Sequence, residues 1–246
     1  MVKYNRIGLF SIFVCVAFVG VGTTPRSTHA ADGFYVGVNA GKNWASGGNG
    51  STDVAGGLLN ASLYDINAKS GGLVGGAIGY KFSDLWRTDV SYTRLKNILN
   101  WKGDFKGLAT PTHFTSDTTS HVLLLNGYLH AKGLNEDTFN TFDPFIGAGI
   151  GFVRNRVTNV VETSNTGAFV SYPADGRELH PAIRVGVGVD TQITPALTFT
   201  PALDAYWLGE FQTGDTRVGA SPTRIGAWTA DGIYSVGVSL GLRYTF

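Results

Sequence analysis

Histidine, serine and cysteine side chains are the usual sources of nucleophiles and metal ligands, and they form no catalytic pattern in this 246-residue chain. The one cysteine, Cys15, lies inside an apolar N-terminal stretch. No two of the five histidines have the i, i+4 spacing of a zinc-binding helix. Ser120 and His121 are neighbours, and in a strand they would point to opposite faces. The sequence therefore predicts no catalytic residue, no metal site and no cofactor, and we expect a protein that is not an enzyme.

Closely spaced glycines are the second feature that suggests chemistry, because glycine-rich loops bind phosphate. They occur in "GGLVGG" (71–76) and "GAGIG" (147–151). A nucleotide-binding loop needs the spacing G-x-G-x-x-G between a strand and a helix. In 147–151 glycine recurs at every second residue instead, which is typical of one face of a strand. We interpret these glycines as making room for larger side chains on that face.

The N-terminus has the organisation of a secretory signal peptide. Two bases precede an apolar core at 7–22, and small residues stand at the −1 and −3 positions before Ala31. We expect residues 1–30 to be cleaved and residues 31–246 to form one domain. The leader would remove three of the 19 bases and none of the 18 acids, so the exported chain is close to neutral. Such a charge argues against nucleic acid as a partner.

Eight segments of the exported chain alternate apolar residues with small or polar ones, which is typical of β-strands with two different faces. Short connections (83–85 and 194–196) and one of middle length (133–142) alternate with long ones, as in an up-and-down meander. The long connections are 45–71, 103–119, 158–178 and 213–231. The strand segments are 34–44, 74–82, 86–93, 120–132, 143–156, 182–193, 197–210 and 233–246.

The faces of these strands favour a membrane barrel over a soluble one. Charged residues make up 15% of the chain, against about 25% in a typical soluble domain. The polar face consists mostly of Gly, Ser, Ala, Thr and Asn, which suits the narrow interior of an eight-stranded barrel. Charges of both signs on this face are expected to neutralise one another inside the barrel. The predicted lumenal charge network is Lys81, Arg87, Asp89, Arg184, Asp190, Asp204, Glu210 and Arg243.

Aromatic residues near the segment ends predict the girdles that mark the membrane–water interfaces. The fold class is thus all-β: an eight-stranded antiparallel transmembrane β-barrel in a single domain. In hydrocarbon a sheet edge must be paired, so the first strand, 34–44, has to close on the last, 233–246. The expected girdle residues are Phe34, Tyr35, Trp44, Phe82, Trp86, Trp101, Trp207, Tyr244 and Phe246.

Four stretches resemble the OmpA-like family of outer-membrane β-barrels. They are "ADGFYVGVNAGKNW", "FDPFIGAGIGF", "GVGVDTQITPALTFTPALDAYWLGEF" and "GVSLGLRYTF". The resemblance covers the predicted mature chain. Small eight-stranded members of this family include surface antigens of Gram-negative bacteria, so the resemblance implies a similar role for this chain. It also implies insertion by the outer-membrane assembly machinery, which reads a C-terminal aromatic signal, here Tyr244 and Phe246. We expect no peptidoglycan-binding domain after Phe246, so the cell-wall tethering role of the longer members is not expected here.

The expected location is the bacterial outer membrane, among lipid and lipopolysaccharide, with both termini in the periplasm. The leading functional hypothesis is a non-enzymatic surface barrel whose polar interior is plugged and whose four long connections meet host or other ligands. A pore for ions or small solutes is the alternative. A lipid A-modifying hydrolase is a weaker one.

Overall fold

The structure, a computed structural model, describes residues 33–47, 50–52, 61–105, 111–135, 142–218, 223–224 and 227–246. The predicted leader, 1–30, lies outside the described residues. The described chain is built from strands: β1 (Gly33–Ser46), β2 (Gly50–Thr52), β3 (Ala61–Lys69), β4 (Gly71–Lys81), β5 (Trp86–Phe105), β6 (Thr112–His130), β7 (Phe142–Thr163), β8 (Phe169–Pro173), β9 (Gly176–Gln192), β10 (Leu197–Gln212), β11 (Thr216–Val218), β12 (Thr223–Arg224) and β13 (Trp228–Thr245). Among these residues there is no helix long and apolar enough to cross a bilayer.

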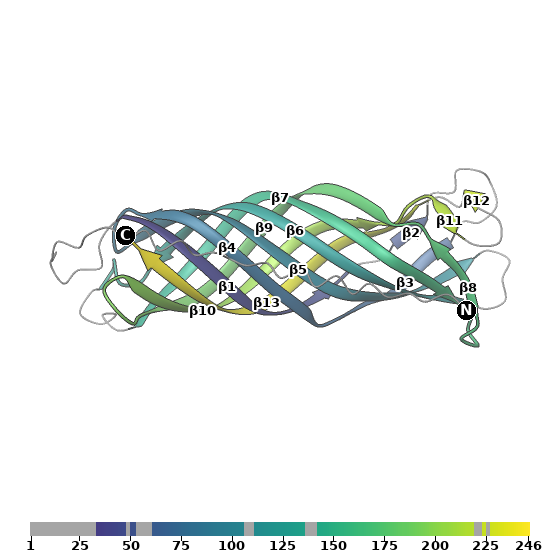
Figure 1. Cartoon of the computed structure of the whole chain (residues 1–246), viewed down its shortest axis with the longest axis horizontal. Coiled ribbons are helices and arrows are strands. Elements are labelled where there is room, and N and C mark those ends of the chain that lie inside the picture. The colour runs from purple at the N-terminus through teal and green to yellow at the C-terminus, as the bar shows by residue number, and fades with distance from the viewer. Residues whose placement is uncertain are drawn as a thin grey trace, which may run out of the picture.

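Eight of these strands form a closed antiparallel ring in the order β1, β4, β5, β6, β7, β9, β10, β13 and back to β1 (Figure 1). Each strand pairs with its successor in the ring, as an up-and-down meander requires. The seam runs from Tyr35 opposite Thr245 to Ser46 opposite Tyr234, so the first and last strands close the barrel as the sequence predicts. The shorter strands β2, β8, β11 and β12 gather at the end away from the C-terminus.

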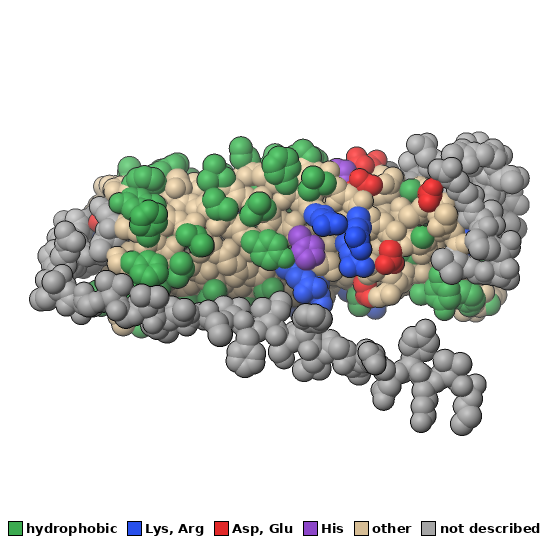
Figure 2. All heavy atoms as spheres, turned by 45° about the horizontal axis from the view of Figure 1, so that its top comes forward, with side chains coloured by type: hydrophobic (Ala, Val, Ile, Leu, Met, Phe, Trp, Pro, Cys, Tyr) green, Lys and Arg blue, Asp and Glu red, His purple; other side chains and the backbone are tan. Residues whose placement is uncertain are grey.

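Apolar side chains cover the outer wall near the C-terminal end of the barrel. On β13 the even-numbered residues from Tyr234 to Phe246 are exposed, while Ser235 and Ser239 between them are buried. The same alternation exposes Ile78 on β4 and Ile150 on β7, each 67% exposed. Figure 2 shows hydrophobic side chains spread over the wall of this part of the barrel, which we call the apolar band. A wall of this composition is stable against lipid and not against water.

The strands are longer than the membrane requires, which corrects the extent of the predicted long connections. A transmembrane strand needs about 9–11 residues, whereas β5, β6 and β7 have 20, 19 and 22. Strand structure therefore enters all four segments that the sequence assigned to long loops. Segment 103–119, for example, consists largely of the paired ends of β5 and β6. Beyond the bilayer the barrel continues as a projecting tube.

Inside this projecting part the barrel is largely apolar, with a few buried polar residues such as Thr112, Ser116 and Glu162, so the prediction of a mainly polar interior is wrong there. The outer wall at this level carries polar residues such as Lys96, Thr115 and Asp117, and faces water. Apolar side chains therefore point inward, as in a soluble barrel. Trp101, predicted to belong to a girdle, is buried and stacks on Phe114, with ring centroids 5.4 Å apart. The interior cluster here includes Leu95, Leu99, Trp101, Phe114, Val157, Leu208, Phe211, Trp228 and Ile233.

Tyr35 is the other exception among the predicted girdle residues. It is 1% exposed and points into the barrel. The reason is its place on β1, where it shares a face with Gly37 and Asn39, opposite to the exposed Phe34 and Val36. The remaining seven are exposed, from 38% at Tyr244 to 66% at Phe34.

Candidate functional site

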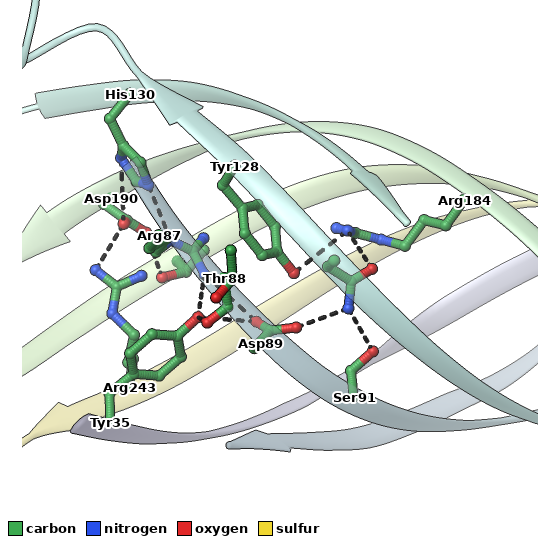
Figure 3. Close-up of polar contacts among 12 residues, drawn as sticks. Tyr35, Arg87, Thr88, Asp89, Ser91, Tyr128, His130, Arg184, Asp190 and Arg243 are labelled. Atoms are coloured by element: carbon green, nitrogen blue, oxygen red, sulfur yellow. Dashed lines mark hydrogen bonds and ion pairs between the residues drawn. The ribbon is translucent and has the colours of Figure 1, made fainter. Parts of the chain in front are cut away.

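The membrane-spanning half of the barrel is filled by a network of buried polar side chains (Figure 3). Its first part joins β1 to β5. The Tyr35 hydroxyl donates to Asp89 Oδ2 at 2.9 Å and accepts from Arg87 Nη1 at 3.1 Å. Arg87 and Asp89 lie two residues apart on β5 and so point to the same face. Their ion pair is 3.6 Å long and nearly fully buried.

The second part of the network extends from Asp89 across β6 to β9 and β10. Asn126 Nδ2 donates to Asp89 Oδ1 at 2.6 Å. Arg184 Nη1 lies 3.4 Å from Asn126 Oδ1 and 3.3 Å from the Tyr128 hydroxyl. Its Nη2 donates to Asp204 Oδ1 at 2.5 Å. The two charges of the Arg184–Asp204 pair are buried but paired, which is the condition under which burial is tolerated.

The third part lies toward the C-terminal end of the barrel, around His130. Arg87 Nε donates to His130 Nε2 at 2.8 Å, and His130 Nδ1 lies 2.8 Å from Asp143 Oδ2. Asp190 Oδ2 is 3.8 Å from His130 Nδ1 and forms an ion pair with Arg243 Nη2 at 2.7 Å. The network thus takes side chains from β1, β5, β6, β7, β9, β10 and β13, seven of the eight ring strands.

Six of the eight charges that the sequence assigned to the lumen meet in this network: Arg87, Asp89, Arg184, Asp190, Asp204 and Arg243. Lys81 lies at the end of β4 and pairs with Asp84 of the following turn at 2.5 Å. Glu210 lies outside the network. The pairing of β10 with β13 shifts at Gly209, whose φ is +70°, so Leu208 and Phe211 face the interior and the alternation moves by one residue.

Four residues of the network are absent from the predicted set because they carry no fixed charge: Tyr35, Asn126, Tyr128 and His130. The alternation of the sequence placed each of them on the polar face, and this position was the signal that could have assigned them to the interior. Tyr128 is a centre of the arrangement, since the Arg87 guanidinium carbon lies 3.6 Å from the centroid of its ring. Asp143, at the start of β7, also belongs to the network through His130.

The regularly spaced glycines serve this packing, as the sequence analysis proposed. An ideal Cβ on Gly147 would lie 2.6 Å from Tyr128 Cδ1. On Gly79 it would lie 2.5 Å from Tyr35 Cζ and 2.6 Å from its hydroxyl. Both distances are shorter than a carbon–carbon or carbon–oxygen contact allows. Tyr128 and Tyr35 fit inside the barrel because the neighbouring strands have glycine, which has no side chain, at these positions.

His130, Asp143 and Asp190 are the described residues whose geometry resembles a metal site. Their ligand atoms lie within 4.8 Å of one another. Two guanidinium groups already supply positive charge there: Arg87 occupies His130 Nε2, and Arg243 pairs with Asp190. A cation would have to compete with both arginines. The arrangement fits a charge-neutralising interior better than a metal centre.

The space left inside the network is small. A cavity of about 100 Å³ is lined by Tyr35, Asn39, Arg87, Asp89, Arg184 and Arg243 among others. This volume holds a few water molecules. Toward the projecting end, the cavity between Leu99, Trp101, Phe211 and Trp228 is about 10 Å³. Among the described residues, the side chains that line these two cavities leave little free space between them.

Comparison with known proteins shows the fold. No family model matches the sequence, and no curated protein sequence matches it. The outer membrane protein OprG from Pseudomonas aeruginosa has 17% identity, covers 87% of this chain and 97% of its own, and superimposes with a TM-score of 0.51. Neisserial surface protein A has 19% identity over 87% and 97% of the two chains, with a TM-score of 0.46. The Ail protein of Yersinia pestis has 12% identity over 87% and 99%, with a TM-score of 0.39.

The chain therefore has the fold of an outer-membrane β-barrel. This fold and the apolar outer wall together place it in the bacterial outer membrane.

Proposed function

We propose that this protein is a non-enzymatic surface barrel with a closed interior, which contributes to outer-membrane integrity and presents its projecting end to the exterior. The observation that carries this proposal is the filling of the interior: seven of eight ring strands contribute side chains to one buried polar network. An apolar cluster follows it toward the projecting end. A continuous aqueous path would have to break ion pairs in which both partners are buried.

Conductance in planar bilayers tests the closed interior. We expect the refolded protein to give no steady conductance. The variant Arg184→Ser with Asp204→Ser enlarges the cavity of about 100 Å³ without leaving a lone charge, and it should also give no steady conductance, because the apolar cluster around Trp101 and Phe114 still closes the projecting half. The control Lys42→Ala changes an exposed side chain on the outer wall and should behave like the native protein. Steady conductance by the native protein would contradict the proposal and favour a small-solute pore.

The lipid A-modifying hydrolase remains the weaker alternative. The described histidines do not support it. His130 is committed to Arg87 and Asp143, and His121 lies beside Tyr92 on the outer wall. Unchanged lipid A in cells that overproduce the protein is the expected result. Deacylated lipid A that depends on His121 or His180 would favour the enzyme.

Recognition and assembly follow from the same proposal. We place any contact with host or other ligands at the projecting end, formed by segments 45–71, 103–119, 158–178 and 213–231. The family motifs support kinship with OmpA-like barrels. Tyr244 and Phe246 are proposed as the signal for the assembly machinery. They are exposed on the outer wall, with ring centroids 5.2 Å apart.

A further inference from the structure

Six basic side chains gather on the outside of the barrel, where the apolar band ends. They are Arg94 and Lys96 on β5, His121 on β6, Arg154 and Arg156 on β7, and Arg177 on β9, which we call the outer basic patch. Figure 2 shows basic side chains grouped directly beyond the apolar band. The patch exists only in the folded barrel, because its members come from four neighbouring strands.

The register of the sheet places this patch at the membrane border. Arg94, His121 and Arg154 lie opposite one another across β5, β6 and β7. The next outward-facing row toward the C-terminal end is Tyr92, Leu123 and Phe152, paired in the same way and 47%, 52% and 60% exposed. The step from an apolar row to a basic row takes two residues along each strand, about 7 Å. The patch therefore lies at the level of lipid headgroups.

This level belongs to the outer leaflet. The start of β1 and the C-terminus lie side by side at the opposite end of the apolar band, where short turns join the strands (Figure 1). In bacterial barrels the short turns are periplasmic and the long connections extracellular. The outer basic patch thus borders the leaflet that contains lipopolysaccharide.

The outer basic patch carries an excess of positive charge. Arg156 lies directly opposite Arg177, and like charges at such positions destabilise a sheet. In the part of the chain that the structure describes, one ion pair reaches the patch, between Arg156 Nη2 and Asp175 Oδ2 at 3.8 Å, with both side chains about half exposed. Arg94 Nε is buried without a hydrogen-bond partner. Donors are thus in excess over acceptors.

The patch also has a concave centre. A groove of about 350 Å³ is lined by His121, Arg154, Arg156 and Arg177. Guanidinium groups bind phosphate through two parallel hydrogen bonds, and several of them around one groove match a phosphate with its three oxygens. The adjoining row of Tyr92, Leu123 and Phe152 would contact acyl chains. A ligand with a phosphorylated headgroup above acyl chains fits both surfaces at once.

We propose that the outer basic patch binds the phosphate groups of lipid A, the lipid part of lipopolysaccharide, in the outer leaflet. Arg154 and Arg177 hold a phosphate from neighbouring strands, Arg94 and Arg156 flank it, and the apolar row below contacts the acyl chains. The inference rests on the proposed placement of the barrel, with its long connections outside. As a consequence, ordered lipid would be held on one side of the barrel.

Lipid binding by the full protein in detergent micelles tests this proposal. Native mass spectrometry would count bound lipid with two probes, lipid A carrying two phosphates and the same lipid after enzymatic dephosphorylation. We expect the phosphorylated form to bind, and Arg154→Ala with Arg177→Ala to weaken it about tenfold or more. Arg154→Lys with Arg177→Lys keeps the charge but loses the paired hydrogen bonds, and should give an intermediate affinity.

The matched control is Lys42→Ala with Lys102→Ala, which removes an exposed base and a partly exposed base paired with Asp65, both outside the patch, and should leave lipid binding unchanged. Heat-modifiable mobility on detergent gels shows independently that each variant forms a barrel, so a failure of the barrel itself is distinguished from a failure of this site. Equal weakening by the control pair, or equal binding of the dephosphorylated lipid, would overturn the proposal. So would displacement of the lipid by millimolar inorganic phosphate, which indicates a free-phosphate site, or tighter binding of heparin, which indicates a sulfated glycan as the ligand.

Discussion

Arg184 on β9 and Asp204 on β10 are diagonal neighbours inside the barrel, and their side chains meet at 2.5 Å with less than a tenth of either exposed. Arg184 also reaches Asn126 and Tyr128 on β6. The Arg184 side chain therefore links β6 on one side of the interior to β10 on the other. The energetic role of the Arg184–Asp204 pair follows from the burial, since a charge that loses its partner there is shielded from bulk water and is not compensated by it.

A double-mutant cycle measures this role. Arg184→Met should destabilise the barrel by about 3–5 kcal/mol because it leaves Asp204 buried without its partner. Asp204→Leu should cost a similar amount for the opposite charge. The double variant should cost clearly less than the sum of the two, since no lone charge remains. Urea unfolding in micelles, followed by tryptophan fluorescence, gives the free energies. Additive losses would show that the two side chains act independently.

Gly79 and Gly72 on β4 make a matched pair for testing the packing of Tyr35. An alanine Cβ at Gly79 would lie 2.3 Å from the backbone carbonyl oxygen of Thr88 and 2.5 Å from Tyr35 Cζ, whereas at Gly72 nothing lies within 4 Å. We expect Gly79→Ala to destabilise the barrel by about 1–3 kcal/mol through overpacking. Gly72→Ala should be neutral or slightly stabilising, because it reduces only the freedom of the unfolded chain. Unfolding midpoints in the same detergent compare the two. Equal midpoints would mean that Tyr35 can move aside without cost.

Phe246 connects the two ends of the described chain, since its backbone N–H donates to the Phe34 carbonyl at 3.0 Å. Deletion of Phe246 should reduce the heat-modifiable fraction in isolated outer membranes severalfold, because it removes this bond and the proposed assembly signal. Shortening the turn at 164–168, far from the seam, should leave that fraction near the native level. The comparison uses equal synthesis levels measured by immunoblot. Equal assembly of the two variants would contradict a special role of the last residue.

His121 reports on the charge of the outer basic patch. It lies outside the apolar band, beside Tyr92 and Arg94 on β5 and Arg154 and Arg156 on β7. Partial burial and then the three arginines hold the pKa of His121 below its ordinary value of about 6.5. The imidazole should therefore be neutral at pH 7 in phosphate-free micelles and gain a proton only as the pH falls below 6.5.

Binding of a phosphorylated lipid should raise the pKa of His121, because the phosphate charge offsets the arginines and stabilises the imidazolium. A nuclear magnetic resonance titration of the imidazole with and without lipid A measures the shift. Arg154→Ala should raise the same pKa in the absence of lipid. A midpoint that lipid A leaves unchanged would place the phosphate elsewhere.

Much of the fold was predictable because a strand has a period of two. The alternation in 233–246 assigned every residue of that segment to a face, and the structure gives the same assignment from Ile233, buried, to Phe246, exposed. The need to pair every edge in hydrocarbon then required the seam between β1 and β13. The polar face likewise contained most of the buried network. These results follow from local pattern and solvent, and no knowledge of register is needed.

The projecting half was harder to predict because the solvent outside the wall and the face that carries the apolar residues both change there. Where the wall leaves the bilayer, the outside becomes aqueous, and apolar residues move to the interior. Trp101 and Phe114 lie inside for this reason, although Gly, Ser, Thr and Asp in the same segments suggested loops. The bulge at Gly209 moved Glu210 off the interior face, and a shift of one residue cannot be read from alternation alone.

The sequence by itself determined that this chain is an eight-stranded barrel with an apolar wall, a small-residue interior and a terminal strand that closes the ring. It did so because alternation is a property of consecutive residues. The tertiary structure decided which side chains meet. Arg87 contacts Tyr128, and Arg156 faces Arg177, through the stagger of neighbouring strands. A different stagger of the same strands would keep every face and change every partner, so the interior network and the outer basic patch belong to the folded barrel alone.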